Sequence, residues 1–161
     1  MNTLIDGQTV KYDVEDSDII SVFPWRIGKS KRGRYLYYSV WHKLGVIRYL
    51  YHRMVIDIKD GYVVDHINGD TLDNRKENLR VCTIAQNAWN RKHYDNNTTG
   101  YKGVSVKNGK HGIRYQSHIR YCGHLIHIGT YSTAELASAA YVEYSKRIYG
   151  EFASDRFKGG V

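Results

Sequence analysis

The sequence predicts an α+β protein with three consecutive parts: a β-rich N-terminal segment, a strand–loop–strand–helix unit, and a three-stranded antiparallel sheet backed by one helix. Three observations predict it. Short runs of alternating apolar and polar residues, separated by glycines, fill residues 1–60. Two short apolar runs, a polar loop between them and a helix-start signal occupy residues 62–93. Three further alternating runs and one helical pattern follow in residues 101–158.

The first segment is expected to consist of strands joined by turns at glycines. The alternating runs cover residues 10–14, 35–38 and 47–58, and the expected turns fall at Gly28, Gly33, Gly45 and Gly61. Residues 29–34 contain four basic side chains and are expected to form a basic loop. A plain β scaffold that carries this loop is therefore predicted.

The second segment has signals for each of its parts. An apolar run over residues 62–66 ends in Asp65 and His66, and the triplet at 68–70, Asn-Gly-Asp, is a turn signal. A second short run follows over residues 79–82. Thr83 and Gln86 have the spacing of a capping box, so we expect a helix from there to about residue 93.

The third segment begins after a polar stretch over residues 95–100, which favours a linker. Strands are expected over residues 101–107, 113–121 and 124–129, followed by a helix that begins at Thr133 and ends at Gly150. The helix residues spaced to cover the sheet are Leu136, Ala139, Ala140 and Tyr144.

The charge is unevenly distributed. The chain of 161 residues has a net charge of +8, and fifteen of its residues are Tyr. Residues 1–60 hold ten basic and seven acidic groups, residues 61–100 five of each, and residues 101–161 nine and four. A neutral centre rich in carboxylates and carboxamides, between two basic flanks, suits a cation-binding site between elements that hold a polyanion such as DNA.

The cysteines and the hydropathy exclude some classes. Cys82 and Cys122 are forty residues apart and form no CxxC pair, which argues against a structural zinc site. Two reduced thiols in a cytoplasmic protein are favoured, and one disulfide stays open. The N-terminus does not have the pattern of a signal peptide, and no apolar run is long enough to span a membrane, so no membrane partner is expected.

A dense polar motif fills the second segment, and its residues are Asp65, His66, Asn68, Gly69, Leu72, Asp73, Asn74, Arg75, Asn78, Leu79, Arg80, Gln86, Asn87 and Asn90. With these residues the segment resembles the HNH (ββα-metal, His-Me finger) endonucleases of the homing type, as found in phages and introns. His66, Asn78 and Asn87 stand at the signature positions, so the resemblance is to the H-N-N variant. It implies a metal-dependent DNA endonuclease that hydrolyses phosphodiester bonds.

The chemistry of these residues agrees with that implication. Neutral imidazole can take a proton from the attacking water, so His66 is the expected general base. Mg²⁺, or alternatively Mn²⁺, prefers oxygen ligands, which Asp65 and Asn87 would supply together with the substrate phosphate. Adjacent strand residues point to opposite faces, so we expect the strand to break at the Asn68–Gly69 turn and let Asp65 and His66 face one point.

The other motif residues are expected to hold the loop. Asn78 is predicted to hydrogen-bond loop backbone, and Asp73 and Asn74 to fix the loop. Four residues stay open between two roles: Asn90 as an alternative metal ligand, Arg75 and Arg80 as phosphate contacts or loop residues, and His52 as a group behind the catalytic histidine or a plain strand residue.

The third segment resembles the Apetala/ethylene-response-factor (ERF) DNA-binding domain. The residues that carry this resemblance are Gly103, Val104, Ile119, Gly129, Thr130, Tyr131, Thr133, Ala134, Glu135, Ala137, Ala140, Tyr141 and Phe157. It implies that the exposed face of the sheet lies in the major groove and that Ile113, Tyr115, Ser117 and Ile119 face the helix. The expected DNA contacts are Lys102, Ser105, Lys107, Arg114, Gln116, His118, Arg120 and His127. Plant members carry Arg and Trp at several of these positions, so the binding expected here is weaker and dominated by phosphate contacts.

The sequence therefore predicts a nuclease domain over residues 1–94, a linker over 95–100 and a DNA-binding domain over 101–158. The predicted function is that of a phage or intron-associated homing or nicking endonuclease, acting on double-stranded DNA in the bacterial host cytoplasm. A monomer implies nicking, and double-strand cleavage would need either a homodimer, which stays open, or two separate cleavage events. The alternative is a catalytically silent DNA-binding regulator that uses the C-terminal sheet, and an RNA-binding protein is disfavoured by the nuclease motif.

Overall fold

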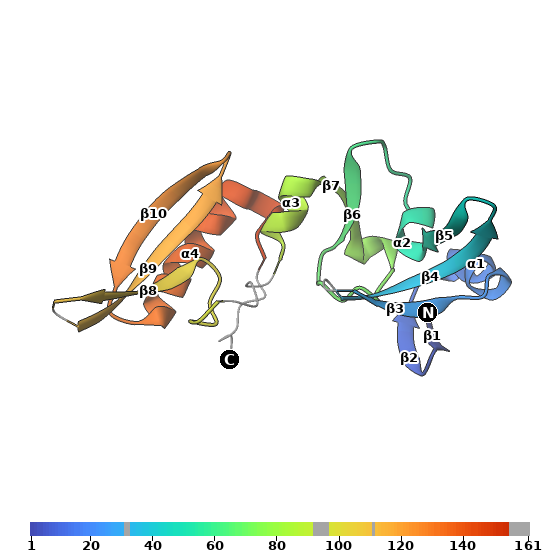
Figure 1. Cartoon of the computed structure of the whole chain (residues 1–161), viewed down its shortest axis with the longest axis horizontal. Coiled ribbons are helices and arrows are strands. Elements are labelled where there is room, and N and C mark those ends of the chain that lie inside the picture. The colour runs from blue at the N-terminus through green and yellow to red at the C-terminus, as the bar shows by residue number, and fades with distance from the viewer. Residues whose placement is uncertain (31–32, 92–96, 111, 155–161) are drawn as a thin grey trace. The chain divides into compact units, whose positions relative to one another are not determined.

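The computed structural model describes residues 1–30, 33–91, 97–110 and 112–154. Within these residues the protein is mixed α/β, and its strands form four small sheets of two or three strands each (Figure 1). Met1–Asn87 and Ala88–Val161 form two compact units. The predicted combination of small antiparallel sheets with a few helices is confirmed, and the two units are described in turn.

The first unit begins with a hairpin of β1 (Asn2–Ile5) and β2 (Gln8–Lys11). A short 3₁₀ turn (Val14–Asp16) and α1 (Ser17–Val22) follow. A three-stranded antiparallel sheet then forms in the order β3 (Arg26–Ser30), β4 (Gly33–His42) and β5 (Gly45–Leu50), and α2 (Tyr51–Met54) follows it directly.

Two details of the predicted β scaffold are wrong. Gly28 lies inside β3 and not in a turn, and the strand expected over 47–58 ends at Leu50, where α2 begins. An aromatic core explains the helical segments. Trp25 packs edge-on against Tyr51 of α2 at a centroid distance of 5.2 Å, and its Nε1 donates to the Ile19 carbonyl of α1 at 2.9 Å. The pattern of apolar residues alone does not decide between strand and helix for these short segments. Packing of α1 and α2 around the buried Trp25 favours the helical form.

The strand–loop–strand–helix unit is present as β6 (Tyr62–His66), a loop that ends in a 3₁₀ turn (Lys76–Asn78), β7 (Leu79–Thr83) and α3 (Ile84–Trp89). The capping box is confirmed: Thr83 N–H donates to Gln86 Oε1 at 2.9 Å, and Gln86 N–H donates to Thr83 Oγ1 at 3.2 Å. α3 ends at Trp89, before the expected end near residue 93, which lies outside the described residues.

The second unit contains β8 (Val104–Gly109), β9 (Gly112–Tyr121) and β10 (His124–Tyr131), with β9 in the centre of the sheet. α4 (Ala134–Tyr149) packs against all three strands, and a 3₁₀ turn (Gly150–Phe152) follows it. Three antiparallel strands and one helix were predicted and are confirmed (Figure 1). The N-cap is also confirmed, because the Thr133 side chain accepts from Leu136 N–H at 3.3 Å.

The face of α4 that covers the sheet differs from the predicted one. The buried residues at four-residue spacing are Ala137, Tyr141, Ser145 and Tyr149. Leu136 is 53% exposed and Ala139 is also exposed, so their predicted packing is wrong. Tyr141 and Tyr149 form one buried cluster with Ile119 of β9, and large aromatic side chains of this kind dominate the energetics of a core, which favours this orientation of the helix.

The predicted linker falls partly outside the described residues, at positions 95 and 96. Its remainder forms a hydrogen-bonded turn of the second unit. Asn97 Oδ1 accepts from Thr99 N–H at 2.9 Å and from Gly100 N–H at 3.1 Å. The division after Asn87 falls inside α3, earlier than the predicted linker.

Gly103→Ala should destabilise the protein far more than a comparable change elsewhere in the second unit. Gly103 has φ +73°, and a Cβ there would lie 2.1 Å from Tyr141 Cδ2 and 2.6 Å from the His118 carbonyl oxygen. We expect a loss of about 3 kcal/mol in the free energy of unfolding, from the clash and the left-handed backbone together. Gly123→Ala is the control, with φ +82° and open space around its Cβ, and should cost about 1 kcal/mol. Equal losses in urea denaturation would contradict the close packing of Gly103.

Candidate active site

β6 ends in two buried polar residues, Asp65 and His66, which are 7% and 4% exposed. Asp65 pairs with Arg80 and His66 with Leu79 across the β6–β7 ladder. Both residues are thus within the strand, and their side chains point to opposite faces. The expected strand break before the turn is wrong: the turn starts only after His66, whose carbonyl accepts from Gly69 N–H at 2.9 Å.

His66 packs against neighbours that come from three other parts of the first unit. Its Nε2 lies 3.2 Å from Asn74 Oδ1. Asn74 Nδ2 donates to the Leu72 carbonyl at 3.3 Å, which fixes the orientation of that carboxamide. Because Oδ1 can only accept, Nε2 of neutral His66 carries the proton, and Nδ1 is the nitrogen that can take one up. The His66 ring is 5.1 Å from the His52 ring and 6.4 Å from the Tyr35 ring.

Burial keeps both histidines neutral. Desolvation lowers the pKa of His66, against the opposing effects of the Asn74 hydrogen bond and of nearby carboxylates. Desolvation, and then electrostatic interaction with the neighbouring His66 and Arg53, lower the pKa of His52 to about 3. The ring of His52 is thus neutral beside the neutral ring of His66 at pH 7.

His52→Gln should make the protein less sensitive to acid. His52 has its ordinary pKa of 6.5 in the unfolded chain and a pKa of about 3 in the folded one, so between these values only the unfolded chain binds the proton. The stability is full above pH 6.5 and falls as the pH drops, by about 1.4 kcal/mol per pH unit for this residue. Urea denaturation at several pH values between 6.5 and 4 gives the slope of the unfolding free energy against pH. We expect this slope to be smaller by about 1.4 kcal/mol per pH unit in the variant. The control is His42→Gln on the exposed end of β4. If His52→Gln has the same slope of unfolding free energy against pH as the wild type, His52 is not held neutral by burial in the folded protein.

The opposite face of β6 carries a charged pair. Arg80 Nε and Nη2 donate to Asp65 Oδ2 at 3.0 and 2.8 Å, and both side chains are largely buried. Cys82 is on the same face, and burial together with the Asp65 charge raises its pKa to about 11. Arg80, which sequence left open between phosphate and loop contacts, is therefore placed on the carboxylate of Asp65.

Asn87 lies in α3, the helix that begins two residues after Cys82. A backbone hydrogen bond links Asn87 to the Cys82 sulfur, next to the charge of Asp65. In the described part of the chain, the carboxamide of Asn87 forms no hydrogen bond. Among the described residues no three His, Cys, Asp or Glu side chains could hold a metal together. One carboxylate and one carboxamide nevertheless form an oxygen donor set that fits a hard divalent ion with further oxygen ligands from substrate or water.

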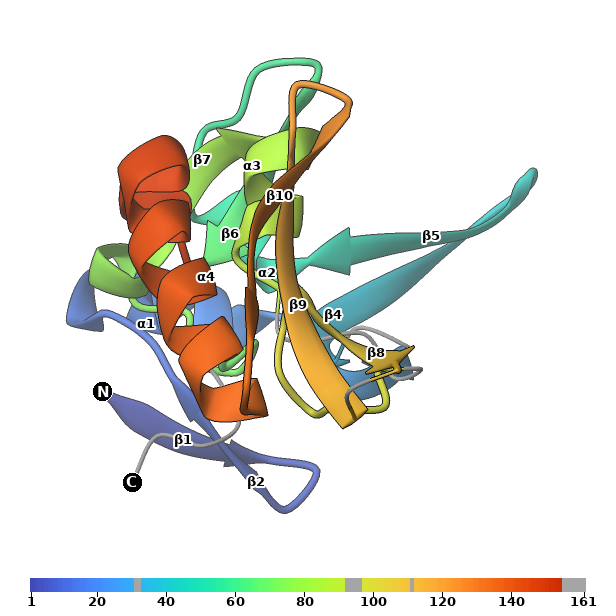
Figure 2. The ribbon, with the colours of Figure 1, turned by 90° about the vertical axis from the view of Figure 1, so that its left-hand side faces the viewer.

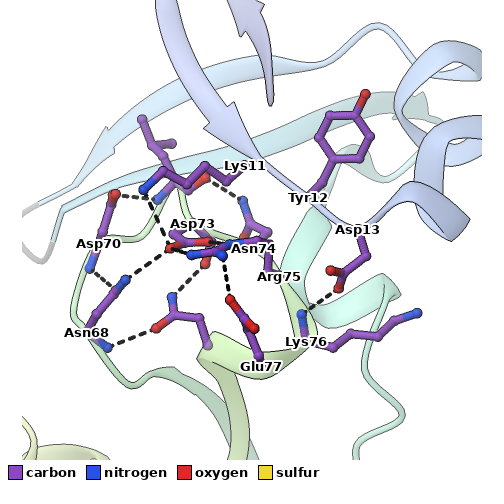
Figure 3. A network of polar contacts seen from close by, with 12 residues as sticks. Lys11, Tyr12, Asp13, Asn68, Asp70, Asp73, Asn74, Arg75, Lys76 and Glu77 are labelled. Atoms are coloured by element: carbon purple, nitrogen blue, oxygen red, sulfur yellow. Dashed lines mark hydrogen bonds and ion pairs between the residues drawn. The ribbon is translucent and has the colours of Figure 1, made fainter. Parts of the chain in front are cut away.

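Asp73 is the centre of the loop between β6 and β7 (Figure 3). Its side chain is fully buried and accepts from Arg75 Nε and Nη2, each at 2.8 Å. Asn68 Nδ2 donates to the same carboxylate at 3.1 Å, and Lys11 Nζ lies 3.8 Å away. Arg75, the other arginine that sequence left open, is placed on this loop carboxylate and also contacts Glu77.

Asn78 and Asn74 complete the loop. Asn78 Oδ1 accepts from Asn68 N–H at 2.9 Å, and its Nδ2 donates to the Asp73 carbonyl at 2.7 Å. Asn74 is fully buried against His66. The loop thus positions the general-base candidate through one side chain, Asn74, and is itself held by hydrogen bonds of two others.

Sequence reasoning missed the residues that approach this loop from the N-terminal segment. β2 forms a parallel bridge between Lys11 and Asp73, in which Lys11 N–H donates to the Leu72 carbonyl at 2.9 Å and Asn74 N–H donates to the Lys11 carbonyl at 2.8 Å. Asp13 Oδ2 accepts from Lys76 N–H at 2.7 Å. More than fifty residues separate these partners, so no local pattern marks them.

The second unit gathers most of the predicted DNA contacts on one face of its sheet. Side chains directly opposite each other on paired strands lie on the same face of the sheet. Arg114 and Gln116 of β9 are opposite Lys107 and Ser105 of β8, and His118 of β9 is opposite His127 of β10. Ser117 and Ile119 between them are buried, as predicted, whereas Ile113 is 59% exposed near the strand's start, where its predicted packing against the helix is wrong. Arg114 and Arg120 are exposed.

In the second unit, two predicted site residues, Lys102 and Asn90, contact other residues of the unit or are buried in it. Lys102 Nζ donates to the carbonyls of Trp89 and Arg91 at 2.5 and 2.7 Å, so its ammonium group contacts the end of α3. Asn90, the alternative metal ligand, is 3% exposed. Phe157 of the ERF resemblance falls outside the described residues.

The buried Asp-His pair, the asparagine-rich loop and the capped helix define a site of nuclease type, and comparisons with known proteins agree. The family model described as HNH endonuclease matches residues 50–89. Over 141 residues the chain is 30% identical to an uncharacterized HNH endonuclease of Acanthamoeba polyphaga mimivirus. The aligned region covers 84% of this chain and 68% of that protein. The chain belongs to the HNH endonuclease family.

A second relative matches a shorter part. Protein 3.8 of Escherichia phage T7 is 44% identical over 48 residues, which is 30% of this chain and 40% of that protein. No solved structure matches the chain. In the described residues no helix is long and apolar enough to cross a membrane.

Proposed function

We propose that the chain is a metal-dependent DNA endonuclease of the H-N-N type, in which β6, β7 and α3 form the ββα-metal unit and His66 is the general base. The observation that carries this proposal is the state of His66. Its ring is buried and neutral, and Nε2 donates to Asn74, so Nδ1 is the basic nitrogen of this tautomer.

The hydrolysis follows from that tautomer. His66 Nδ1 takes one proton from the attacking water as the water oxygen bonds to phosphorus, and the bond from phosphorus to the leaving sugar oxygen breaks. The imidazolium that forms keeps its Nε2 hydrogen bond to Asn74 Oδ1, which stabilises the positive charge. The leaving oxygen takes its proton from solvent.

Asp65 and Asn87 are proposed to hold the metal, with Mg²⁺ first and Mn²⁺ as the alternative. When bound, the metal would stabilise negative charge on the scissile phosphate. Arg80 fixes the Asp65 carboxylate through two hydrogen bonds to Oδ2. Since Asp65 and His66 leave opposite faces of β6, the scissile phosphate would lie across the end of that strand, with the base on one side and the metal ligands on the other.

Plasmid cleavage tests the proposed function. The purified full chain is incubated with supercoiled plasmid and Mg²⁺ or Mn²⁺, with EDTA in a parallel reaction. We expect nicked or linear product with metal and none with EDTA. Nicked product alone would indicate a monomer, and early linear product a dimer. Tight binding without any cleavage would instead support a DNA-binding regulator.

The second unit is proposed to bind double-stranded DNA through its exposed β8–β10 face, in the manner of an ERF-like domain. The proposed domain division remains residues 1–94 for the nuclease and 101–158 for DNA binding. A homing or nicking enzyme that acts in the cytoplasm of a bacterial host is the role we propose, in agreement with the similarity to a phage protein.

Replacing Arg114 and Arg120 by alanine should weaken DNA binding without affecting the fold. Both side chains are exposed on the proposed face, so the double variant should reduce the slope of log affinity against log salt by about 2. Fluorescence anisotropy with a labelled duplex at several salt concentrations measures it. Arg147→Ala/Lys146→Ala on α4 is the control, because these exposed residues belong to the helix. An equal effect of both pairs would contradict a specific role of the sheet.

A further inference from the structure

The segment that contains β3, β4 and β5 carries the positive charge of the protein. Residues 19–56 contain eight Lys and Arg and no Asp or Glu. The rest of the chain contains sixteen basic and sixteen acidic residues, so this segment alone accounts for the net charge of +8. Charge concentrated in this way creates a local positive potential that attracts a polyanion.

This charge is not neutralised within the described part of the protein. Arg26 forms an ion pair with Asp6 at 3.2 Å. The other basic side chains of the segment that the structure describes form no ion pair with a described residue; they are Lys29, Arg34, Lys43, Arg48 and Arg53. The surface is therefore available for phosphate groups.

One face of the sheet combines these charges with aromatic rings. Tyr37 of β4 is opposite Arg26 of β3, and Ser39 is opposite Arg48 of β5, so these side chains share a face. The Arg48 guanidinium lies 5.3 Å from the centre of the Tyr37 ring. Gly28 makes room for that ring, since a Cβ there would lie 2.6 Å from Tyr37 Cε1.

The same face begins at the candidate active site. Tyr35 is two residues before Tyr37 and thus on the same side of β4, and its ring lies 5.6 Å from His52 and 6.4 Å from His66. The opposite face packs on the core through Leu36 and Tyr38. A continuous aromatic and basic face, which we call the ribbon face (Tyr35, Tyr37, Trp41 and Arg48), therefore leads away from the general base.

The ribbon ends in exposed apolar side chains. Figure 2 shows β4 and β5 extending as a two-stranded ribbon beyond the rest of their sheet. Near its tip Trp41 is 85% exposed and Leu44 is 89% exposed. Two-stranded ribbons fit DNA grooves, and apolar side chains on such elements insert between base steps. Because Lys43 and Arg48 flank the tip, charge complementarity favours DNA over an apolar partner surface.

We propose that the β4–β5 ribbon is a DNA-binding arm, which holds the duplex beside the cleavage site through Tyr37 and Arg48 and inserts Trp41 and Leu44 into a groove. The proposal rests on the proposed nuclease function. Tyr35 and Trp41 are six residues apart, which is about 20 Å along a strand. At about 3.4 Å per base pair, the tip would reach a site about six base pairs from the cut.

Binding by variants of the full chain tests the arm independently of cleavage. We expect Trp41→Ala/Arg48→Ala to weaken binding to a labelled duplex of 30 base pairs about tenfold and to reduce the salt slope by about 1. Both side chains are exposed, so the thermal unfolding midpoint should stay unchanged. The matched control is Leu4→Ala/Lys59→Ala, which removes one exposed apolar and one exposed basic side chain from the same unit.

Two further readouts locate the effect. DNA should quench the tryptophan fluorescence of the wild type, and Trp41→Phe should remove that quenching while it keeps most of the affinity. Light scattering of the wild type and the double variant identifies a contact between copies. If the double variant changes a dimer to a monomer and leaves the affinity per chain unchanged, the ribbon is an interface between copies and the arm proposal is wrong.

The two proposals fail in different ways. If the double variant binds DNA with wild-type affinity while the wild type cleaves plasmid, the arm is overturned and the nuclease function stands. If the wild type binds duplex and does not cleave, the variant's affinity still decides the arm. If the wild type neither binds nor cleaves, both proposals are overturned.

Discussion

His66→Ala should lower the rate of plasmid cleavage between about 100-fold and 10,000-fold, which is the usual range for loss of a general base. The variant removes the only proposed proton acceptor for the attacking water. Affinity for DNA should change little, because His66 is 4% exposed and offers almost no contact surface. Single-turnover cleavage at saturating enzyme separates the chemical step from binding.

Two further variants, His42→Ala and Asn74→Ala, are compared with this one. His42→Ala alters an exposed residue on the hairpin and should cleave at the wild-type rate. Asn74→Ala should give an intermediate loss, since Asn74 Oδ1 holds the His66 tautomer. Wild-type cleavage by His66→Ala would show that another group activates the water.

Asp73→Ala should lower the free energy of unfolding by about 3 kcal/mol, the largest stability effect expected in the first unit. Asp73 is fully buried and is contacted by Arg75, Asn68 and Lys11. Its removal leaves these donors without their acceptor. The side chain of Arg75 is 35% exposed, so its guanidinium can partly turn to water, which keeps the loss below that of a fully enclosed pair.

Urea denaturation of the full chain measures this loss, and Asp57→Ala, at an exposed position before β6, should change stability by less than about 0.5 kcal/mol. Hydrogen bonding to Arg75 holds the pKa of Asp73 below its usual value. Its contribution is therefore present above the ordinary pKa and is lost as the pH falls through the lower folded value. Equal stability of Asp73→Ala and Asp57→Ala would contradict the role of the loop carboxylate.

The sequence predicts the parts of this structure that local hydrogen bonds determine. The Thr83–Gln86 capping box and the Thr133 N-cap each join residues three apart, so their partners are visible in a short window. The Asn68 turn is of the same kind, because Asn68 Oδ1 accepts from Asp70 N–H at 2.8 Å. The density of the motif also identified the family, which the comparisons confirm.

The environment of the site depends on the tertiary fold and was not predictable in this way. Tyr35 approaches His66 from a different sheet, and the Lys11 backbone approaches Asp73 from the first hairpin. Asp65 and His66 point to opposite faces because the β6–β7 ladder continues through His66. The Asn68–Gly69 turn signal had suggested that the strand breaks earlier. Long-range pairing, and not residue type, decides each of these.

The parallel bridge between β2 and the loop has a consequence for any attempt to shorten the protein. Residues matched by the family model start at position 50, yet Lys11 binds the backbone on both sides of Asp73, through Leu72 and Asn74. A fragment that starts at position 50 would keep every letter of the motif and lose the strand to which its catalytic loop is tied. The smallest active nuclease should therefore retain the first hairpin, which no part of the motif encodes.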